Sequence, residues 1–423
     1  MSCTKLKNIQ NQDNNSLICI VKCNHQTDLF EAYINKKVLL TGVRSLFTLD
    51  LARRFHEKGY RVFTAETSLH HICRFSNAIE KNFVIPSPRF HSDRFITALV
   101  EICDREKIDI VVPTFEEIFC LAKGLHRFPK SCTILCENYE TLDHLHNKWL
   151  FNKKIEHMGL SSPKSYLVHS QKELDELPLK APYILKPSYS RSSMQVQKVT
   201  SATTPKIKFT SHNPFVAQEF IHGKKFCSYS ISHSGKLSAH VVYPVDISIE
   251  GNSCLNFKVI SHAGIEEWIK HFVEKENFTG QIAFDFIENS QGKLYAIECN
   301  PRGTSGLHLF QKKDDLPNAF LNFSDKCIYP TIGYSKQIIW GMLLYGWKTT
   351  RPSIFIRKFL KTKDIIFSLQ DIKPFLYQPL LFGVYIFKSL KLRARLPAMF
   401  TFDIDWNGQE ATTFEQSSCE DLS

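Results

Sequence analysis

Two carboxylates and one carboxamide carry the strongest chemical signal in the sequence. Asp285 and Glu298 lie on two predicted strands, residues 280–287 and 293–300, which a short polar turn connects. Adjacent antiparallel strands present such side chains next to each other, and Asn300, two residues after Glu298, shares its face. Three hard oxygen donors suit Mg²⁺ that keeps water ligands and bridges phosphates. The alternative is an ordinary strand pair with solvent-facing polar residues.

Three basic residues add to this signal. Arg302 falls on the same face as Asn300, and its planar guanidinium matches a phosphate or carboxylate. Lys186 ends a short apolar strand, and Lys148 lies on a predicted helix earlier in the chain. A fixed ammonium at either position could hold phosphates, although an isolated lysine is more often a surface residue.

Taken in this order, the residues resemble the ATP-grasp superfamily, and closely its carbamoyl-phosphate-synthase-like branch. The most specific part is Ala-Ile-Glu-Cys-Asn-Pro-Arg at residues 296–302, followed by Gly-Thr-Ser-Gly. The resemblance covers residues 36–310, including the Rossmann-like domain that usually precedes the grasp domain. Residues 402–408, Phe-Asp-Ile-Asp-Trp-Asn-Gly, are similar to a subgroup of stand-alone members.

The resemblance implies a role for each candidate residue. Asp285, Glu298 and Asn300 would hold Mg²⁺ or Mn²⁺. Arg302 would stabilise the transferred phosphoryl group or the acyl phosphate. The implied ATP contacts, with adenine along the last four, are Lys148, Lys186, Ser188, Arg191, Gln218, Glu219, Phe220 and Ile221.

The reaction implied by the resemblance activates a carboxylate as an acyl phosphate, releases ADP, and lets an amine or another nucleophile attack. The chain departs from the family pattern at two places. Loop 188–193 has no glycine, and Lys225 stands where a glutamate commonly meets the ribose hydroxyls. Two alternatives therefore stay open: an ATP-binding protein without turnover, in a regulatory or interaction role, and a phosphotransferase.

The elements that must position these residues form three units after an extension over residues 1–35. Strands and helices alternate over residues 36–137, which predicts an α/β domain with a Rossmann-like parallel sheet. Residues 138–310, the implied two-lobed ATP-grasp domain, begin with a helix over 139–157 and continue as an α+β unit of hairpin-connected strands. Residues 311–423 are predicted to be a mostly helical, basic C-terminal domain with a loose acidic tail.

Four other residues have competing interpretations. Glu116 and Glu117 follow a predicted strand, where ligands often bind in open α/β sheets, but a substrate role is the less favoured interpretation. His308 is favoured as a packing or solvent-facing residue over a substrate contact. Cys299 points away from Glu298 by strand alternation and is predicted to lie in the core.

Composition supports a globular protein in a reducing compartment. Apolar residues make up 43% and charged residues 22% of the 423 residues, which argues against wholesale disorder. The 13 cysteines are scattered and show no zinc-ribbon spacing. With no secretory leader visible, the sequence predicts reduced thiols in the cytoplasm.

The net charge of +11 is concentrated near the C-terminus, where residues 351–395 hold ten Lys or Arg against two Asp. A solvated helix face is the favoured interpretation, followed by an anionic-substrate site and then by a membrane surface or nucleic acid. No nucleic-acid motif is present, and the apolar stretch 375–387 is too short to span a bilayer. The expected partners are therefore ATP, a small-molecule carboxylate and a nucleophile, with homo-oligomerisation left open.

Overall fold

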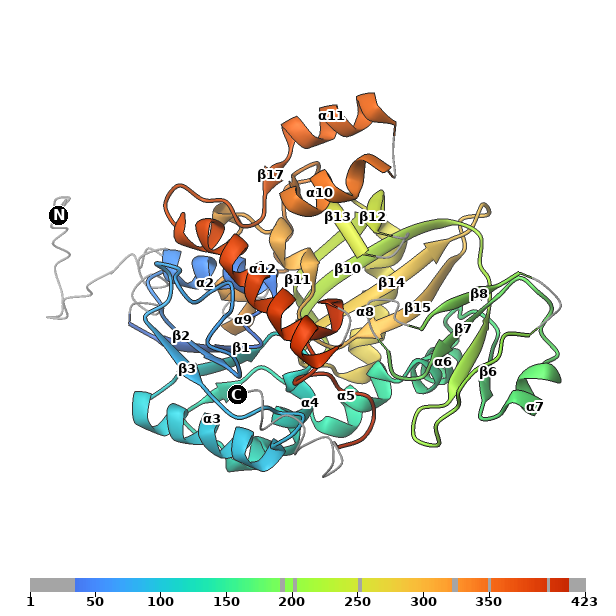
Figure 1. Cartoon of the computed structure of the whole chain (residues 1–423), viewed down its shortest axis with the longest axis horizontal. Coiled ribbons are helices and arrows are strands. Elements are labelled where there is room, and N and C mark those ends of the chain that lie inside the picture. Colours follow the sequence, from blue (N-terminus) through green and yellow to red (C-terminus); the bar gives the residue numbers. More distant parts are fainter. Residues whose placement is uncertain are drawn as a thin grey trace, which may run out of the picture.

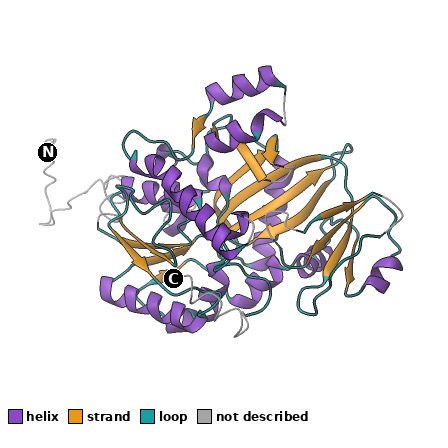
Figure 2. Ribbon diagram, in the orientation of Figure 1, coloured by secondary structure: helices purple, strands orange, loops and turns teal. Residues whose placement is uncertain are grey.

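The computed structural model describes residues 35–190, 195–200, 204–249, 253–321, 326–348, 351–393 and 396–410. Three expectations lie outside these ranges: the extension before residue 35, the phosphate contact of Arg191, and the loose acidic tail. Figure 1 shows the arrangement of the described elements, and Figure 2 separates helices from strands.

The N-terminal part is a parallel sheet with the strand order β3-β2-β1-β4-β5. Its elements are β1 Lys37–Thr41, α2 Leu46–Glu57, β2 Arg61–Glu66, β3 Lys81–Val84, α3 Ser92–Glu106, β4 Ile110–Pro113, α4 Glu117–Lys123, η1 Leu125–Arg127 and β5 Thr133–Ile134. The order reverses between β1 and β4, as in a Rossmann-like sheet, where ligands commonly bind beyond the carboxyl ends of the strands. The predicted α/β class is confirmed.

The prediction of one helix over residues 139–157 is wrong in one respect, because two helices occupy this range. They are α5 Tyr139–His146 and α6 Lys148–His157. Asn147 separates them: its backbone is extended, and its side chain accepts hydrogen bonds from Trp149 N and Leu150 N. Asparagine is a strong N-cap, so it starts a new helix at Lys148 instead of continuing the old one.

A small antiparallel sheet follows, with the strand order β6-β9-β7-β8. Its elements are β6 Ser165–Val168, α7 Gln171–Asp175, β7 Tyr183–Pro187, β8 Gln197–Val199 and β9 Phe215–Glu219. Val168, Leu185 and Ala217 pack in its own hydrophobic cluster. This sheet is therefore a separate lobe with its own core.

The larger lobe is an antiparallel sheet with the strand order β11-β10-β14-β15. Its elements are β10 Lys224–His233, β11 Lys236–Pro244, α8 Ala263–Glu276, β14 Gly280–Glu288 and β15 Leu294–Asn300. Phe284 and Phe286 of β14 pack with Trp268 and Phe272 of α8 in one buried cluster. Because successive side chains of a strand point to opposite faces, Asp285 is turned away from α8.

The C-terminal part is mostly helical, as predicted, and also contributes two short strands. Its elements are η2 Ser305–Leu309, η3 Lys312–Asp314, α9 Leu316–Leu321, β16 Ser335–Gln337, α10 Ile339–Leu344, η4 Gly346–Lys348, α11 Pro352–Lys361, β17 Lys363–Asp364, α12 Lys373–Leu392 and η5 Leu396–Phe400. Strands β16 and β17 extend the pair β12 Ile247–Ile249 and β13 Ser253–Lys258 into a four-stranded sheet. This region therefore pairs with strands that come before β14 in the chain.

Two buried ion pairs fasten the C-terminal part to the N-terminal sheet domain. Asp371 accepts hydrogen bonds from Arg53 Nε at 2.9 Å and Ser76 Oγ at 2.6 Å. Asp403 contacts Arg44 Nη1 at 2.6 Å, and Arg44 also reaches Glu66. Arg53 and Asp371, like Arg44 and Asp403, are more than 300 positions apart in the chain, so the ion pairs form only when both parts are folded.

Asp371→Ala should lower the free energy of unfolding by about 3 kcal/mol, because it leaves the buried Arg53 guanidinium without its carboxylate. Urea titration followed by circular dichroism measures this loss. Asp93→Ala removes an exposed carboxylate that contacts Arg127 and should change stability little. Equal losses in the two variants would show that the Arg53–Asp371 contact is not a stabilising anchor.

Candidate active site

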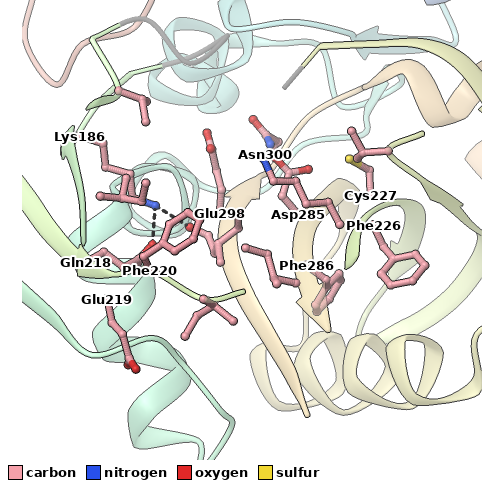
Figure 3. A pocket seen from close by; sticks show the side chains of 17 residues that line it. Lys186, Gln218, Glu219, Phe220, Phe226, Cys227, Asp285, Phe286, Glu298 and Asn300 are labelled. Carbon is pink, nitrogen blue, oxygen red and sulfur yellow. Dashed lines mark hydrogen bonds between the residues drawn. The ribbon is translucent and has the colours of Figure 1, made fainter. Parts of the chain in front are cut away.

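A cavity of about 220 Å³ lies between the small and the large lobe. Figure 3 shows side chains from both sheets projecting into it. Its lining residues are Ile184, Lys186, Val196, Gln218, Glu219, Phe220, Ile221, Lys225, Phe226, Cys227, Val245, Asp285, Phe286, Ile287, Ile297, Glu298 and Asn300. One part of the wall is aliphatic and aromatic, and another carries the charged groups, so the cavity is amphipathic.

The carboxylates meet as the sequence predicts, because Asp285 of β14 is directly opposite Glu298 of β15. In Figure 3 these two side chains and Asn300 project into the same space. Cys299, the residue between Glu298 and Asn300, is buried in the cluster under α8. Strand alternation therefore places the three oxygen-bearing side chains on the cavity face.

A β-bulge next to this pair was not predicted. Phe286 is opposite Ala296 whereas Asp285 is opposite Glu298, so Ile297 has no residue across from it. Its carbonyl oxygen instead accepts a hydrogen bond from Lys186 Nζ at 3.0 Å. Bulges free a backbone group from the ladder and re-aim nearby side chains, and here the freed carbonyl binds a lysine of the other lobe.

Lys186 is buried and reaches the cavity from the end of β7. Its Nζ donates to Gln218 Oε1 at 2.9 Å, and Gln218 Nε2 donates in turn to Ser165 Oγ at 3.0 Å. Burial lowers the pKa of Lys186 from 10.5 to about 8, against the opposing effect of the Glu298 carboxylate. At neutral pH this ammonium is charged, fixed in place and little solvated.

Lys148 approaches the same carboxylates from the first position of α6. Its Nζ lies 3.2 Å from Glu298 Oε1 and 2.5 Å from the carbonyl oxygen of Ser190. Its backbone nitrogen donates to Ser188 O at 2.9 Å. The N-cap at Asn147 sets where α6 begins, and thereby places this lysine between the carboxylate and the loop after β7.

The pKa values of the two carboxylates are shifted in opposite directions. Burial raises the pKa of Asp285 from 3.8 to about 6, and the adjacent Glu298 carboxylate adds to this rise. Burial also acts to raise the pKa of Glu298, but Lys148 and Lys186 outweigh it and hold that pKa below its ordinary value. Glu298 is therefore the stable anion, and the Asp285 carboxylate is repelled by it.

A divalent cation fits this donor set. Within the described ranges, no group of three or more His, Cys, Asp or Glu side chains could hold a metal ion, so a closed metal site is not formed there. Asp285, Glu298 and Asn300 instead suit an ion that completes its shell with phosphate oxygens and water. A cation at this position would also relieve the repulsion that raises the pKa of Asp285.

Arg302 lies where the large lobe meets the residues that follow β4 of the N-terminal sheet. Its Nη2 is 3.2 Å from Asn300 Oδ1 and 3.4 Å from Glu116 Oε1, and its guanidinium lies 4.9 Å from the centre of the Phe115 ring. Gly303 allows this approach, because a Cβ atom there would lie 2.8 Å from Thr114 O. Arg302 is thus held by both domains.

Three buried polar atoms around these cations have no hydrogen-bond partner within the described structure: Ser188 Oγ, Ser190 Oγ and Arg302 Nε. Buried donors without partners are costly, so this arrangement favours a bound group that accepts hydrogen bonds. A phosphate has the acceptor oxygens and the charge that such donors require.

The segment implied as the adenine contact borders the cavity with mixed orientation. Gln218, Phe220 and Ile221 line it, whereas the carboxylate of Glu219 accepts a hydrogen bond from Lys164 N and points away from the other labelled side chains in Figure 3. The carboxylate of Glu219 is therefore not available to the cavity. Lys225, the departure from the family pattern, also lines the cavity.

Glu117 and His308, for which the sequence left two interpretations open, are both buried and hydrogen-bonded within the protein. Glu117 is buried and accepts hydrogen bonds from Thr41 Oγ1 and from the backbone nitrogen of Thr114. His308 is buried 2.7 Å from Asp50 Oδ2. Glu116, by contrast, reaches Arg302 and therefore borders the site.

Sequence reasoning missed the part played by residues 402–408 in shaping this site. Trp406 Nε1 donates to Asp143 Oδ1 at 2.9 Å, and Tyr189 OH donates to the other oxygen of the same carboxylate. The backbone nitrogen of Trp406 donates to Glu116 Oε2 at 3.0 Å. The C-terminal strap, residues 401–409, thus joins the partner of Arg302 to the loop that carries Ser188. The similarity of residues 402–408 to a subgroup of stand-alone members singled out this segment, but it did not indicate these contacts.

The candidate site lies in a part of the chain that matches a known protein family. A family model of the ATP-grasp domain matches residues 145–306, which include both lysines, both carboxylates, Asn300 and Arg302. The chain contains an ATP-grasp domain. Its two lobes are the sheets β6-β9-β7-β8 and β11-β10-β14-β15, and the cavity lies between them.

Solved structures of low identity share this fold. N5-carboxyaminoimidazole synthetase from Staphylococcus aureus has a TM-score of 0.56 and 13% identity, covering 71% of this chain and 81% of that chain. L-amino acid ligase from Bacillus licheniformis has a TM-score of 0.55 and 16% identity, with 72% and 80% covered. A biotin carboxylase–beta-gamma-ATP complex from Campylobacter jejuni has a TM-score of 0.53 and 13% identity, with 69% and 71% covered. No curated protein matches the chain in sequence.

Asp285→Asn should stabilise the metal-free protein at neutral pH. Because the folded-state pKa of Asp285 is above its ordinary value, the native chain loses stability as pH rises from 3.8 to about 6. The variant lacks this loss, so its advantage in free energy of unfolding should grow across that range and then level off. Denaturant titrations in chelator at a series of pH values measure the difference.

Glu298→Gln is the matched comparison for that experiment. The pKa of Glu298 is lowered, so its carboxylate adds stability at neutral pH that is lost only as acid protonates it. This variant should therefore be less stable than the native chain at neutral pH. A change of the same sign in both variants would contradict the opposite pKa shifts of Asp285 and Glu298.

Trp406→Ala should loosen the loop after β7, because it frees the carboxylate that holds Tyr189. We expect backbone hydrogen exchange over residues 183–190 to accelerate about tenfold, since a hydrogen bond to a charged group contributes roughly 1.5 kcal/mol. Mass spectrometry of that peptide measures the effect, with α8 as the internal reference. Trp340→Ala, at a half-exposed tryptophan, is the control, and equal acceleration in it would exclude a specific role for the strap.

Proposed function

We propose that the protein is an ADP-forming ligase that uses ATP to join a small-molecule carboxylate to an amine or a related nucleophile. The observation that supports this most is the convergence of Lys148 and Lys186, from two separate elements, on the Asp285–Glu298 pair, with Arg302 hydrogen-bonded to the neighbouring Asn300. Cations that hold phosphates and a carboxylate pair that suits a bridging metal are the parts that phosphoryl transfer requires.

In this proposal Lys186 and Lys148 bind the ATP phosphates. Lys186 is already fixed by Gln218 and by the Ile297 carbonyl, so little conformational entropy is lost when a phosphate binds. The hydroxyls of Ser188 and Ser190, which are buried without partners within the described structure, would donate to phosphate oxygens. Gln218, Glu219, Phe220 and Ile221 would border the adenine, with Glu219 contributing its backbone only.

We also propose that Asp285, Glu298 and Asn300 hold Mg²⁺ or Mn²⁺. When bound, the ion neutralises phosphate charge as it develops during transfer. The residues of the chain supply the position: the strand register keeps both carboxylates on one face, and Arg302 restrains Asn300 through its side-chain oxygen.

Arg302 is the proposed catalytic residue. A carboxylate oxygen of the substrate attacks the γ-phosphorus of ATP, the bond to the bridging oxygen breaks, and ADP leaves. The nucleophile then attacks the acyl carbon, phosphate departs with the bonding electrons, and the amine gives up a proton to it. Arg302, held by Asn300 and Glu116, would stabilise the acyl phosphate by charge-assisted hydrogen bonds.

A second candidate function, ATP binding without turnover, is favoured by one observation. Lys225 lines the cavity in the place where the ribose is expected, and a lysine cannot accept a hydrogen bond from a ribose hydroxyl. This change affects nucleotide affinity and leaves the carboxylate pair unaltered.

We also propose a reducing cytoplasmic location, because the nine cysteines of the described part are free thiols.

Calorimetry with ATP and Mg²⁺ tests the binding site. The native chain should bind with micromolar affinity only when Mg²⁺ is present, and Glu298→Gln and Lys186→Ala should each weaken binding by about tenfold or more, or about 1.4 kcal/mol. Glu219→Gln makes the same chemical change on a lining residue whose carboxylate points elsewhere, so it should bind like the native chain. Absence of binding in the native chain would exclude both candidate functions.

Release of ADP then separates the two functions. A screen of carboxylates and amines should give ADP formation that requires both substrates, and Arg302→Lys should lower this rate about a hundredfold with ATP affinity retained. ATP binding without ADP in any mixture would favour the second candidate. A stable phosphorylated product without an amide would instead indicate a phosphotransferase.

A further inference from the structure

Exposed apolar side chains gather on the C-terminal part of the molecule. Of the twenty large apolar residues that are exposed in the described structure, fifteen lie between Trp340 and Leu390. Scattered single exposures are normal on a protein surface, but the concentration of so many in one segment indicates an interaction site. We call this group, carried by α10–α12 and the loop before α12, the C-terminal apolar face.

Helix α12 is apolar on both of its sides. Tyr377, Leu381 and Tyr385 are buried in the main core cluster with residues of the N-terminal domain. On the opposite side Leu376, Leu380, Phe387 and Leu390 are 67%, 60%, 66% and 72% exposed. Their spacing of four, seven and three residues places them in one stripe, and Gly383 within that stripe has no atom near its Cβ direction. A helix that is apolar all round is normally covered on all sides.

Helices α10 and α11 carry further exposed apolar residues of this group. A cavity of about 450 Å³ is lined by Trp340 and Leu344 of α10 together with Leu381 and Phe382 of α12, so these two helices border one apolar cavity. Helix α11 turns Phe355 and Phe359 toward the Met342 cluster and leaves Ile356 and Leu360 exposed. In Figure 1, α10 and α11 project from the body of the molecule above α12, with α11 the more distant of the two.

The charges around this face are almost all positive. Arg351, Arg357, Lys361, Lys373 and Arg393 are exposed, and none has a carboxylate partner among the described residues. The acidic residues of the same region are used internally. Asp371 is buried against Arg53, and Asp364 accepts hydrogen bonds from the backbone nitrogens of Ile339, Ile366 and Phe367.

We propose that the C-terminal apolar face binds the surface of an anionic lipid bilayer, with α11 and α12 lying in the plane of the interface. Apolar side chains would enter the boundary between headgroups and acyl chains, and the basic residues would meet anionic headgroups. No helix within the described ranges is long and apolar enough to cross a membrane, which fits surface attachment. The exposed basic residues complement the negative charge of anionic headgroups, which favours lipid as the occupant of this face.

Co-sedimentation with vesicles tests this proposal on the full chain. The native protein should bind vesicles of equal parts phosphatidylcholine and phosphatidylglycerol more than about tenfold better than vesicles of phosphatidylcholine alone, and high salt should weaken the binding. Arg357→Glu/Lys361→Glu should lose most of this preference. Lys130→Glu/Lys172→Glu makes the same change of charge at exposed lysines elsewhere and should bind like the native chain.

A second pair of variants tests the apolar contribution. Leu376→Glu/Leu380→Glu should abolish binding at any salt concentration, whereas Val84→Glu, at an exposed position of the N-terminal sheet, should not. Circular dichroism confirms that each variant is folded. Lack of vesicle binding by the native chain, or equal loss in the control variants, would overturn the proposal. A native dimer that becomes monomeric in Leu376→Glu/Leu380→Glu, without vesicle binding, would assign the face to a second copy of the chain.

Discussion

The negative charge of Glu298 is the constraint on which the site depends. Lys148 and Lys186 are both buried, and each would be costly to keep charged without a nearby anion. Lys148 reaches Glu298 directly at 3.2 Å, and the charge of Glu298 opposes the loss of the Lys186 proton. Because Lys186 belongs to the small lobe and Glu298 to the large one, the same charge that orders the cations also links the two lobes.

The C-terminal part contributes contacts that hold residues around the site between the two lobes. Buried contacts of Asp371 and Asp403 attach it to the N-terminal sheet domain, and the strap then runs to Trp406. From there, hydrogen bonds reach the partner of Arg302 in one direction and the loop after β7 in the other. Helix α12 packs one side against the N-terminal domain and leaves the other as the C-terminal apolar face, so the same segment shapes the site and presents a surface.

Much of the site could be predicted from short-range regularities. A strand alternates its side chains with a period of two, so Glu298 and Asn300 share a face and Cys299 takes the other, and the short turn at 289–292 brings Asp285 alongside. The prediction of a single helix over 139–157 was wrong for an equally local reason, because Asn147 caps a second helix that begins at Lys148. The bulge at Ile297 could not be predicted, because it depends on which residues of β14 pair with β15.

The sequence by itself determined the chemical groups, their order along the chain, the α/β and α+β classes, and the face on which the carboxylates lie. Periodicity and turn chemistry act over a few residues, and a sequence displays them directly. Only the tertiary structure decided that Glu116 meets Arg302 and that Trp406 reaches Asp143, because these pairs are separated by 186 and 263 residues. It also decided which side of α12 is buried. An apolar helix can bury either side, and the choice follows from the surfaces against which it packs.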